Sequence, residues 1–120
     1  METVLSIIAV AMADLGIQYE YERFNGTGYP YWTGTYTGID FSAENNRESG
    51  QMLLEGWTRE RNLPLVRHAD QIKKKFRNYQ TAGANSSTVV NFLSAITIPT
   101  GEADLKKIQI VLQTEHWEGI

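Results

Sequence analysis

The side chains that most often carry catalysis or bind metals are few in this sequence and lie far apart. The chain has no cysteine and two histidines, His68 and His116. Neither belongs to a pair with the His-x-x-x-His spacing of zinc sites. His68 and Asp70 are two residues apart in a predicted helix, where their side chains point in different directions. We therefore expect both histidines to be structural, and we expect no metal or other cofactor.

Nucleophilic catalysis and phosphate binding are also not indicated. A catalytic serine needs an activating base, and no serine here lies in a Gly-x-Ser-x-Gly turn. Glu20 and Glu22 share one side of a predicted strand and could form a carboxylate pair, but a solvated strand face explains them better. The segment Gly26-Thr27-Gly28 lacks the third glycine, the lysine and the following helix of a phosphate loop, so it predicts a turn. We expect no enzymatic activity.

Charge is distributed unevenly along the chain. The sequence has 11 basic and 14 acidic residues, for a net charge of −3. Residues 1–58 hold two basic and eight acidic side chains, whereas residues 59–77 hold seven basic and two acidic ones. The basic segment could be a solvated helix face, a phosphate contact or a contact with an acidic protein surface. Because the rest of the chain is acidic, we expect the acidic protein surface rather than DNA.

Aromatic side chains gather in one predicted strand. Tyr29, Tyr31, Trp32 and Tyr36 fall within eight residues. Strand alternation places the first two on one face and the last two on the other. A sheet covered on one side buries only one of these sets, so the second set needs a partner or a fold-back loop, or stays exposed. We expect these rings, together with Trp57 of the next strand, to contribute to an interface.

Length and composition fit a single domain. The 120 residues are 42% hydrophobic and 21% charged, close to the averages of globular proteins. No apolar run is long enough to span a membrane. The apolar stretch 4–12 has no basic segment before it, so it predicts a helix of the mature protein rather than a signal peptide.

Periodicity predicts the element order α-β-β-β-α-β-β within one domain over residues 1–120. The predicted helices cover 4–15 and 62–77, and the predicted strands cover 17–24, 29–38, 51–59, 88–99 and 105–117. The polar segment 42–50 is expected to be an exposed loop or a mobile β-arm. Short connections favour antiparallel pairing. The expected fold is therefore α+β, a two-layer domain with a mainly antiparallel sheet of about five strands and two helices on one face.

Three segments and the element order resemble a known group of phage proteins. They are Tyr-Pro-Tyr-Trp-Thr-Gly-Thr-Tyr at 29–36, Gly-Gln-Met-Leu-Leu-Glu-Gly-Trp-Thr-Arg at 50–59, and the hairpin at 99–110 that begins Pro-Thr-Gly-Glu-Ala-Asp. In this layout the chain resembles the tail-terminator family of long-tailed phages and prophages, also called tail-completion or head–tail joining proteins.

The resemblance implies a non-enzymatic virion protein of the tail or neck that is assembled in the host cytoplasm. It implies a six-membered ring that caps the tail tube, stops its polymerisation and joins the tail to the head connector. The implied partners are further copies of the chain, the tail tube protein and the connector proteins, with no membrane. DNA would pass through the ring without specific binding. A head-completion or stopper neck protein and a stand-alone small protein-binding module remain alternatives.

These considerations give one set of expected interface residues. It combines the aromatic strands, the basic helix and the charged residues of segment 42–50. The members are Tyr31, Trp32, Tyr36, Trp57, Arg67, Lys73, Lys74, Lys75, Arg77, Glu44, Arg47 and Glu48.

Overall fold

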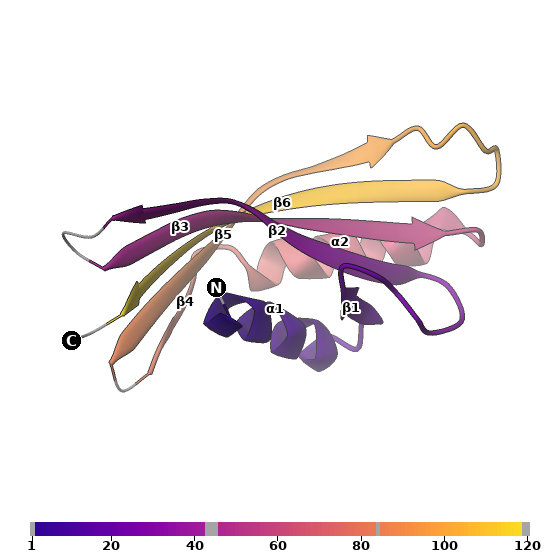
Figure 1. Cartoon of the computed structure of the whole chain (residues 1–120). Helices are drawn as coiled ribbons and strands as arrows, with labels where there is room; N and C mark the ends of the chain where they lie inside the picture. Colours follow the sequence, from indigo (N-terminus) through magenta and orange to yellow (C-terminus); the bar gives the residue numbers. More distant parts are fainter. Residues whose placement is uncertain (1, 43–45, 84, 119–120) are drawn as a thin grey trace.

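The computed structural model describes residues 2–42, 46–83 and 85–118, which form one curled sheet and two helices (Figure 1). In chain order the elements are α1 (Glu2–Asp14), β1 (Tyr19–Tyr21), β2 (Tyr31–Ser42), β3 (Arg47–Thr58), α2 (Asn62–Lys75), β4 (Tyr79–Ala82), β5 (Ser86–Ile98) and β6 (Lys106–Glu118). The strands lie in the order β1-β2-β3-β6-β5-β4. β1 pairs in parallel with β2, and all the other neighbours pair antiparallel.

The expected two-layer α+β fold with five strands is wrong. Half of the described residues lie in strands and 24% in helices, and the sheet is a mixed half-barrel that curls around the helices. One extra strand, β4, comes from the segment between the predicted helix 62–77 and the predicted strand 88–99, where the sequence pattern predicts no strand. The parallel pairing of β1 arises because residues 22–30 carry the chain back before β2 begins. Positive φ angles at Glu22 and Gly28 allow these turns.

Both helices lie on the concave side of the sheet (Figure 1). The strands run on past the helices at the end where β2 meets β3 and β4 meets β5, so the molecule is elongated, measuring 51 × 26 × 25 Å. In the part of the chain that the structure describes, neither helix is long and apolar enough to cross a membrane.

The helices form where the sequence predicts them because each has one apolar face. α1 buries Val4, Ile8, Ala11 and Met12, which share one side of a helical wheel. Its chain leaves the helix at Gly16, which has a positive φ of 72°, as is typical of a helix C-terminus.

The second helix is joined directly to an edge of the sheet. α2 buries Leu65, Ala69 and Ile72 against the sheet. At its C-terminal end the backbone carbonyl of Phe76 accepts a hydrogen bond from the N–H of Phe92 in β5, at 2.9 Å. The basic C-terminal turn of α2 is therefore fixed beside β5.

Aromatic rings pack on glycines along the concave face. A Cβ atom at Gly56 would lie 2.5 Å from the Trp32 ring, and one at Gly50 would lie 2.5 Å from the Tyr36 hydroxyl. Both glycines therefore leave the space that the ring on the neighbouring strand fills. This packing places Trp32 and Tyr36 in the core beneath the helices.

An irregularity in β5 changes which side chains share a face. In a regular strand the even spacing of Phe92 and Ile96 would place them on one side, but the register of β5 shifts between Phe92 and Ser94. Phe92 therefore pairs with Leu112 on the concave face, whereas Ile96 pairs with Gln109 on the convex face and is 52% exposed. The shift is a β-bulge, which one-residue alternation does not anticipate.

The polar segment 42–50 is mostly strand rather than loop. Ser42 pairs with Arg47, so β3 starts within this segment and the β2–β3 ladder continues to its tip. Residues 43–45 lie outside the described part of the chain.

Candidate interaction surfaces

His68 has a packing role in the structure. The indole Nε1–H of Trp32 donates a hydrogen bond to His68 Nδ1 at 3.1 Å. This nitrogen must keep its lone pair to accept the bond, so the neutral ring is the form that fits. Burial lowers the pKa of His68, which favours the same neutral form. His68 thus helps to fix the central tryptophan of the core.

His116 lies in a chain of polar contacts that has the composition of a catalytic triad. Its Nδ1 shares a hydrogen bond with Thr88 Oγ1 at 2.7 Å, and its Nε2 lies 2.7 Å from Glu118 Oε1. A hydroxyl, an imidazole and a carboxylate in this order can activate a nucleophile. However, Thr88 is 1% exposed and His116 is 3% exposed, so the hydroxyl is closed to a substrate in this conformation.

The contacts of His116 therefore satisfy polar groups within the fold. Nearby, Tyr36 and Thr114 share a buried hydrogen bond of 2.8 Å between their hydroxyls. Among the described residues, no group of three or more histidine, aspartate and glutamate side chains is arranged to hold a metal ion.

Two of the aromatic residues expected at an interface lie in the core instead. Trp32 is completely buried and Tyr36 is nearly so. Strand alternation separated the two faces of β2 correctly, but the helices cover the face that carries these two rings. They cannot contact a partner in this fold.

The other two aromatic residues lie on the convex face, which neither of the two described helices covers. Tyr31 stacks on Phe24 with ring centroids 4.5 Å apart, and it pairs across the strands with Trp57. The Nζ of Lys107 lies 4.4 Å from the centroid of a Trp57 ring and forms an ion pair with Glu55. These side chains form a half-exposed row that is braced by its own contacts.

The basic residues expected at an interface lie in α2 and, for Arg77, just after it. Arg67, Lys73, Lys74 and Arg77 are exposed, while the half-buried Lys75 places its Nζ 5.3 Å from the Tyr79 ring centroid. Within the described part of the chain, none of these five cations forms an ion pair. They are therefore free to meet an external anion or acidic surface.

Two of these cations line an open cavity, which we call the cationic pocket. The cavity has a volume of about 360 Å³, and its lining residues are Lys73, Arg77, Asn78, Asn91, Phe92, Leu93 and Gln113. The pocket lies at the β5 bulge, where the Asn78 N–H donates a hydrogen bond to Asn91 Oδ1 at 3.1 Å. The sequence indicated the basic helix but not the strand residues that complete the pocket, because the bulge brings them together.

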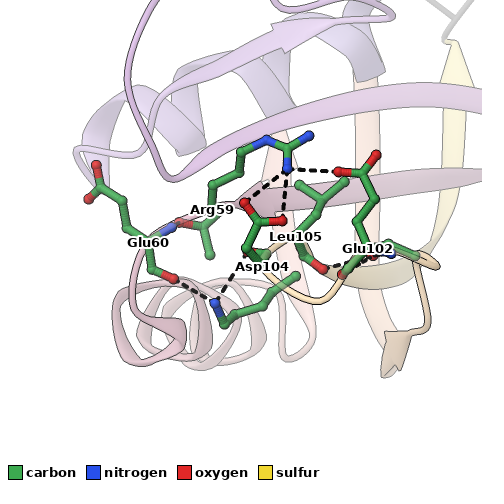
Figure 2. Close-up of polar contacts among 8 residues, drawn as sticks. Arg59, Glu60, Glu102, Asp104 and Leu105 are labelled. Atoms are coloured by element: carbon green, nitrogen blue, oxygen red, sulfur yellow. Dashed lines mark hydrogen bonds and ion pairs between the residues drawn. The ribbon is translucent and has the colours of Figure 1, made fainter.

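Arg59 belongs to a different contact network, although it is part of the same basic segment. Figure 2 shows its guanidinium facing Glu102 and Asp104, at 2.7 and 3.1 Å. These hydrogen bonds raise the pKa of Arg59. The Nζ of Lys106 also donates to the Glu60 carbonyl at 2.9 Å. Together they tie the β5–β6 turn to the end of β3.

The two described charged residues of segment 42–50, Arg47 and Glu48, do not share one site. Glu44 lies outside the described residues. Arg47 lies 4.0 Å from Glu115, and Glu48 is in register with His116 on the adjacent strand. Because Arg47 and Glu48 are consecutive in β3, their side chains point to opposite faces.

An acidic edge lies across the sheet from the cationic pocket. β1 is the outermost strand on that side, and Glu20 and the exposed Glu22 lie in or just after it. α1 contacts β1 and adds the exposed Asp14 at its C-terminal end. From their spacing alone, the first two are expected on a solvated strand face. The excess of acidic over basic residues in the first 58 residues was the sequence feature that indicated an acidic surface here.

Comparison with known proteins gives a likeness of fold. No protein-family model matches the sequence, and no curated protein is recognisably similar to it. Among solved structures, the chain is similar to one in a structure described as "Virion of native gene transfer agent (GTA) particle". The two chains are 15% identical and have a TM-score of 0.68, and the match covers 92% of this chain and 86% of the other. At this identity the likeness shows a shared fold.

Proposed function

We propose that this chain is a structural protein of a tailed phage, or of a phage-like particle, and that it acts as a tail terminator. The observation that carries this proposal is the likeness of its fold to a chain of a gene transfer agent virion. The match extends over nearly the full length of both chains, so it concerns the whole domain. The protein would reside in the tail or neck after assembly in the host cytoplasm.

The proposed role is a ring that caps the tail tube, stops its growth and joins the tail to the head connector. A ring needs heterologous contacts, in which one surface of a subunit binds a different surface of the next. The cationic pocket and the acidic β1 edge support this, because they are distinct, oppositely charged and separated by the width of the sheet. The resemblance of segments 29–36, 50–59 and 99–110 to tail terminators supports the specific role.

The basic residues of α2 would contact protein rather than DNA. Tight phosphate contacts would hold back DNA that must slide through a tail, whereas contacts between subunits would not. An exposed ion pair contributes about 0–1 kcal/mol, so several pairs would set orientation and association rate more than affinity. The role needs no catalytic group or cofactor, in keeping with the burial of Thr88 beside His116.

Native mass spectrometry of the purified protein tests the ring. We expect six copies of the 13.6 kDa chain, about 82 kDa, for a closed hexamer. A mass of 13.6 kDa at all concentrations would instead indicate a stand-alone binding module.

A tube assay separates the terminator from other neck proteins. Adding the protein to polymerising tail tube protein should shorten the tubes, and the protein should be found at their ends. A head-completion or stopper protein would bind the connector and leave tube length unchanged.

Charge reversal tests the role of the basic helix. The triple variant Lys73→Glu, Lys74→Glu and Lys75→Glu should weaken ring formation or docking, and more so at low salt, where charge effects are strongest. Arg61→Glu serves as a control, because this exposed residue lies at the opposite, N-terminal end of α2. If the triple variant assembles normally but loses affinity for duplex DNA, the basic helix binds nucleic acid and this part of the proposal is wrong.

A further inference from the structure

Two open strand edges lie at the same level of the sheet, on its opposite sides. The registers of successive pairs define one row across five strands: Glu20, Thr33, Glu55, Gln109 and Ile96. At this level β1 is the outer strand on one side and β5 is the outer strand on the other. β4 does not cover β5 here, because it pairs only with Ser87 to Val90.

The directions of these two strands suit pairing between copies. β1 runs parallel to β2, and each step from β2 through β3 and β6 to β5 reverses the direction. β1 and β5 therefore run in opposite directions. If a second copy continued the sheet beyond β5, its β1 would meet β5 as an antiparallel neighbour, with Glu20 opposite Ile96 and no shift along the strands.

The open part of β5 lacks the features that usually protect a strand edge. Residues 93–98 read Leu-Ser-Ala-Ile-Thr-Ile, with no charge and no proline. Leu93 is 49% exposed and Ile96 is 52% exposed. Natural sheets normally block such edges with charges, prolines or covering elements, so an unprotected one is a ready site for strand addition.

Charge complementarity identifies the second strand as another copy of this chain. In the row described above, Tyr21 of the added copy lies opposite Ala95, so its Glu22 follows opposite Ser94, the residue next to Leu93. Leu93 lines the cationic pocket together with Lys73 and Arg77. The backbone N–H of Glu22 donates to the Gly34 carbonyl at 2.7 Å, which holds this residue at the sheet edge with its side chain exposed. The carboxylate would thus reach two cations that have no ion pair among the described residues.

We infer that copies of this chain join edge to edge. β1 of one copy pairs antiparallel with residues 95–97 of the next, and Glu22 enters the cationic pocket. This inference rests on the proposed ring and names its two contact surfaces. The contact is heterologous, so each subunit uses both surfaces and the sheet continues from one subunit to the next.

Disulfide trapping tests the pairing, because the natural chain has no cysteine and every disulfide must involve introduced residues. Glu20→Cys and Ile96→Cys are made in separate chains, mixed and mildly oxidised. The Cα atoms of opposed residues on neighbouring antiparallel strands lie about 4.5–5.5 Å apart, within the range of Cα separations that a disulfide spans. Mixed dimers should therefore dominate over like-with-like dimers, and intact mass distinguishes them because the two variants differ in mass.

Gln51→Cys is the matched control. It lies exposed on β3, away from both edges, so its mixture with Glu20→Cys measures cross-linking by chance collision. If Glu20→Cys and Ile96→Cys give mixed dimers only at this chance level, the edge pairing is wrong. If Ile96→Cys pairs predominantly with itself, the β5 edge forms a twofold contact and the heterologous arrangement is wrong.

Charge exchange tests the position of Glu22. Glu22→Lys and Arg77→Glu should each weaken assembly severalfold when present alone. When the two variants are mixed in equal amounts, they can alternate: one contact is natural, and the other has the two charges exchanged. Assembly should therefore recover in the mixture. It should also recover when both changes are in one chain, because every contact then has the charges exchanged. If assembly recovers in neither case, Glu22 does not bind in the cationic pocket.

These results are independent of the closed ring. Efficient cross-linking by a protein that forms open chains rather than rings would support the edge pairing and contradict the terminator proposal. If the natural chain forms a closed ring but Glu20→Cys and Ile96→Cys do not cross-link, the ring stands and the edge pairing is overturned.

Discussion

The substitution Gly56→Ala tests the packing that holds the helices on the sheet. Gly56 pairs with Trp32 across β2 and β3, and the Trp32 ring fills the space above its Cα atom. A Cβ atom there would lie 2.5, 2.6 and 2.7 Å from three carbons of that ring. Trp32 is completely buried and its indole N–H is bonded to His68, so the ring cannot move aside without breaking other contacts.

The expected effect is the difference between two opposing terms. Forcing an extra methyl group into a well-packed core costs about 1–3 kcal/mol. Replacing glycine by alanine in a strand restores about 0.5–1 kcal/mol, mainly because the unfolded chain loses conformational freedom. The free energy of unfolding should therefore fall by about 1–2 kcal/mol, which lowers the Tm of a domain of this size by roughly 3–10 °C.

Urea unfolding followed by circular dichroism measures the change. Gln51→Ala is the control, because it lies on the same strand with its side chain exposed on the convex face. Adding Trp32→Phe to Gly56→Ala should relieve the overlap, so the double variant should lose less stability than the sum of the single variants. If Gly56→Ala is as stable as the natural chain, or no less stable than Gln51→Ala, the packing argument is refuted.

Three further predictions concern polar contacts. Burial lowers the pKa of His68 below 6.5, so the folded state resists the proton that the unfolded state binds. The free energy of unfolding should therefore fall as the pH drops from 7 through 6.5. His68→Gln, whose side chain can still accept the hydrogen bond from Trp32, should remove that part of the pH dependence. Tyr36→Phe should cost about 1–3 kcal/mol in urea unfolding, because it leaves the buried Thr114 hydroxyl without its partner, and adding Thr114→Val should recover much of the loss. Arg59→Ala should speed hydrogen exchange in the β5–β6 turn alone, and an unchanged rate there would contradict its bracing role.

The helices and most strand positions could be predicted because their signals are local. Four buried residues at helical spacing and a glycine after the last turn define α1 without reference to the rest of the chain. The long strands β3 and β6 alternate cleanly, so their concave and convex faces follow from sequence. The pairing order and the coverage of each face depend on contacts between distant segments, which local periodicity does not contain.

The aromatic strand shows this limit most clearly. Alternation in β2 correctly puts Tyr31 and Trp32 on opposite faces. However, alternation is symmetrical, and it does not say which face the helices will cover. Glycines of the neighbouring strand carried that information: Gly56, opposite Trp32, and Gly50, two residues from the partner of Tyr36, leave room for these rings on one face. A glycine on the neighbouring strand at the level of each ring therefore predicts that these two side chains lie in the core.

The acidic and basic segments of the sequence lie on opposite sides of the molecule because of the strand order. The acidic N-terminal part forms α1 and β1 on one side of the sheet, and the basic end of α2 lies beside β5 on the other. This depends on β6 inserting between β3 and β5. If the strands followed their order in sequence, β6 would form the outer edge and would separate the cations from any neighbouring subunit. With β6 inside the sheet, the basic and acidic segments lie at opposite edges at one level, and this is the arrangement that head-to-tail association requires.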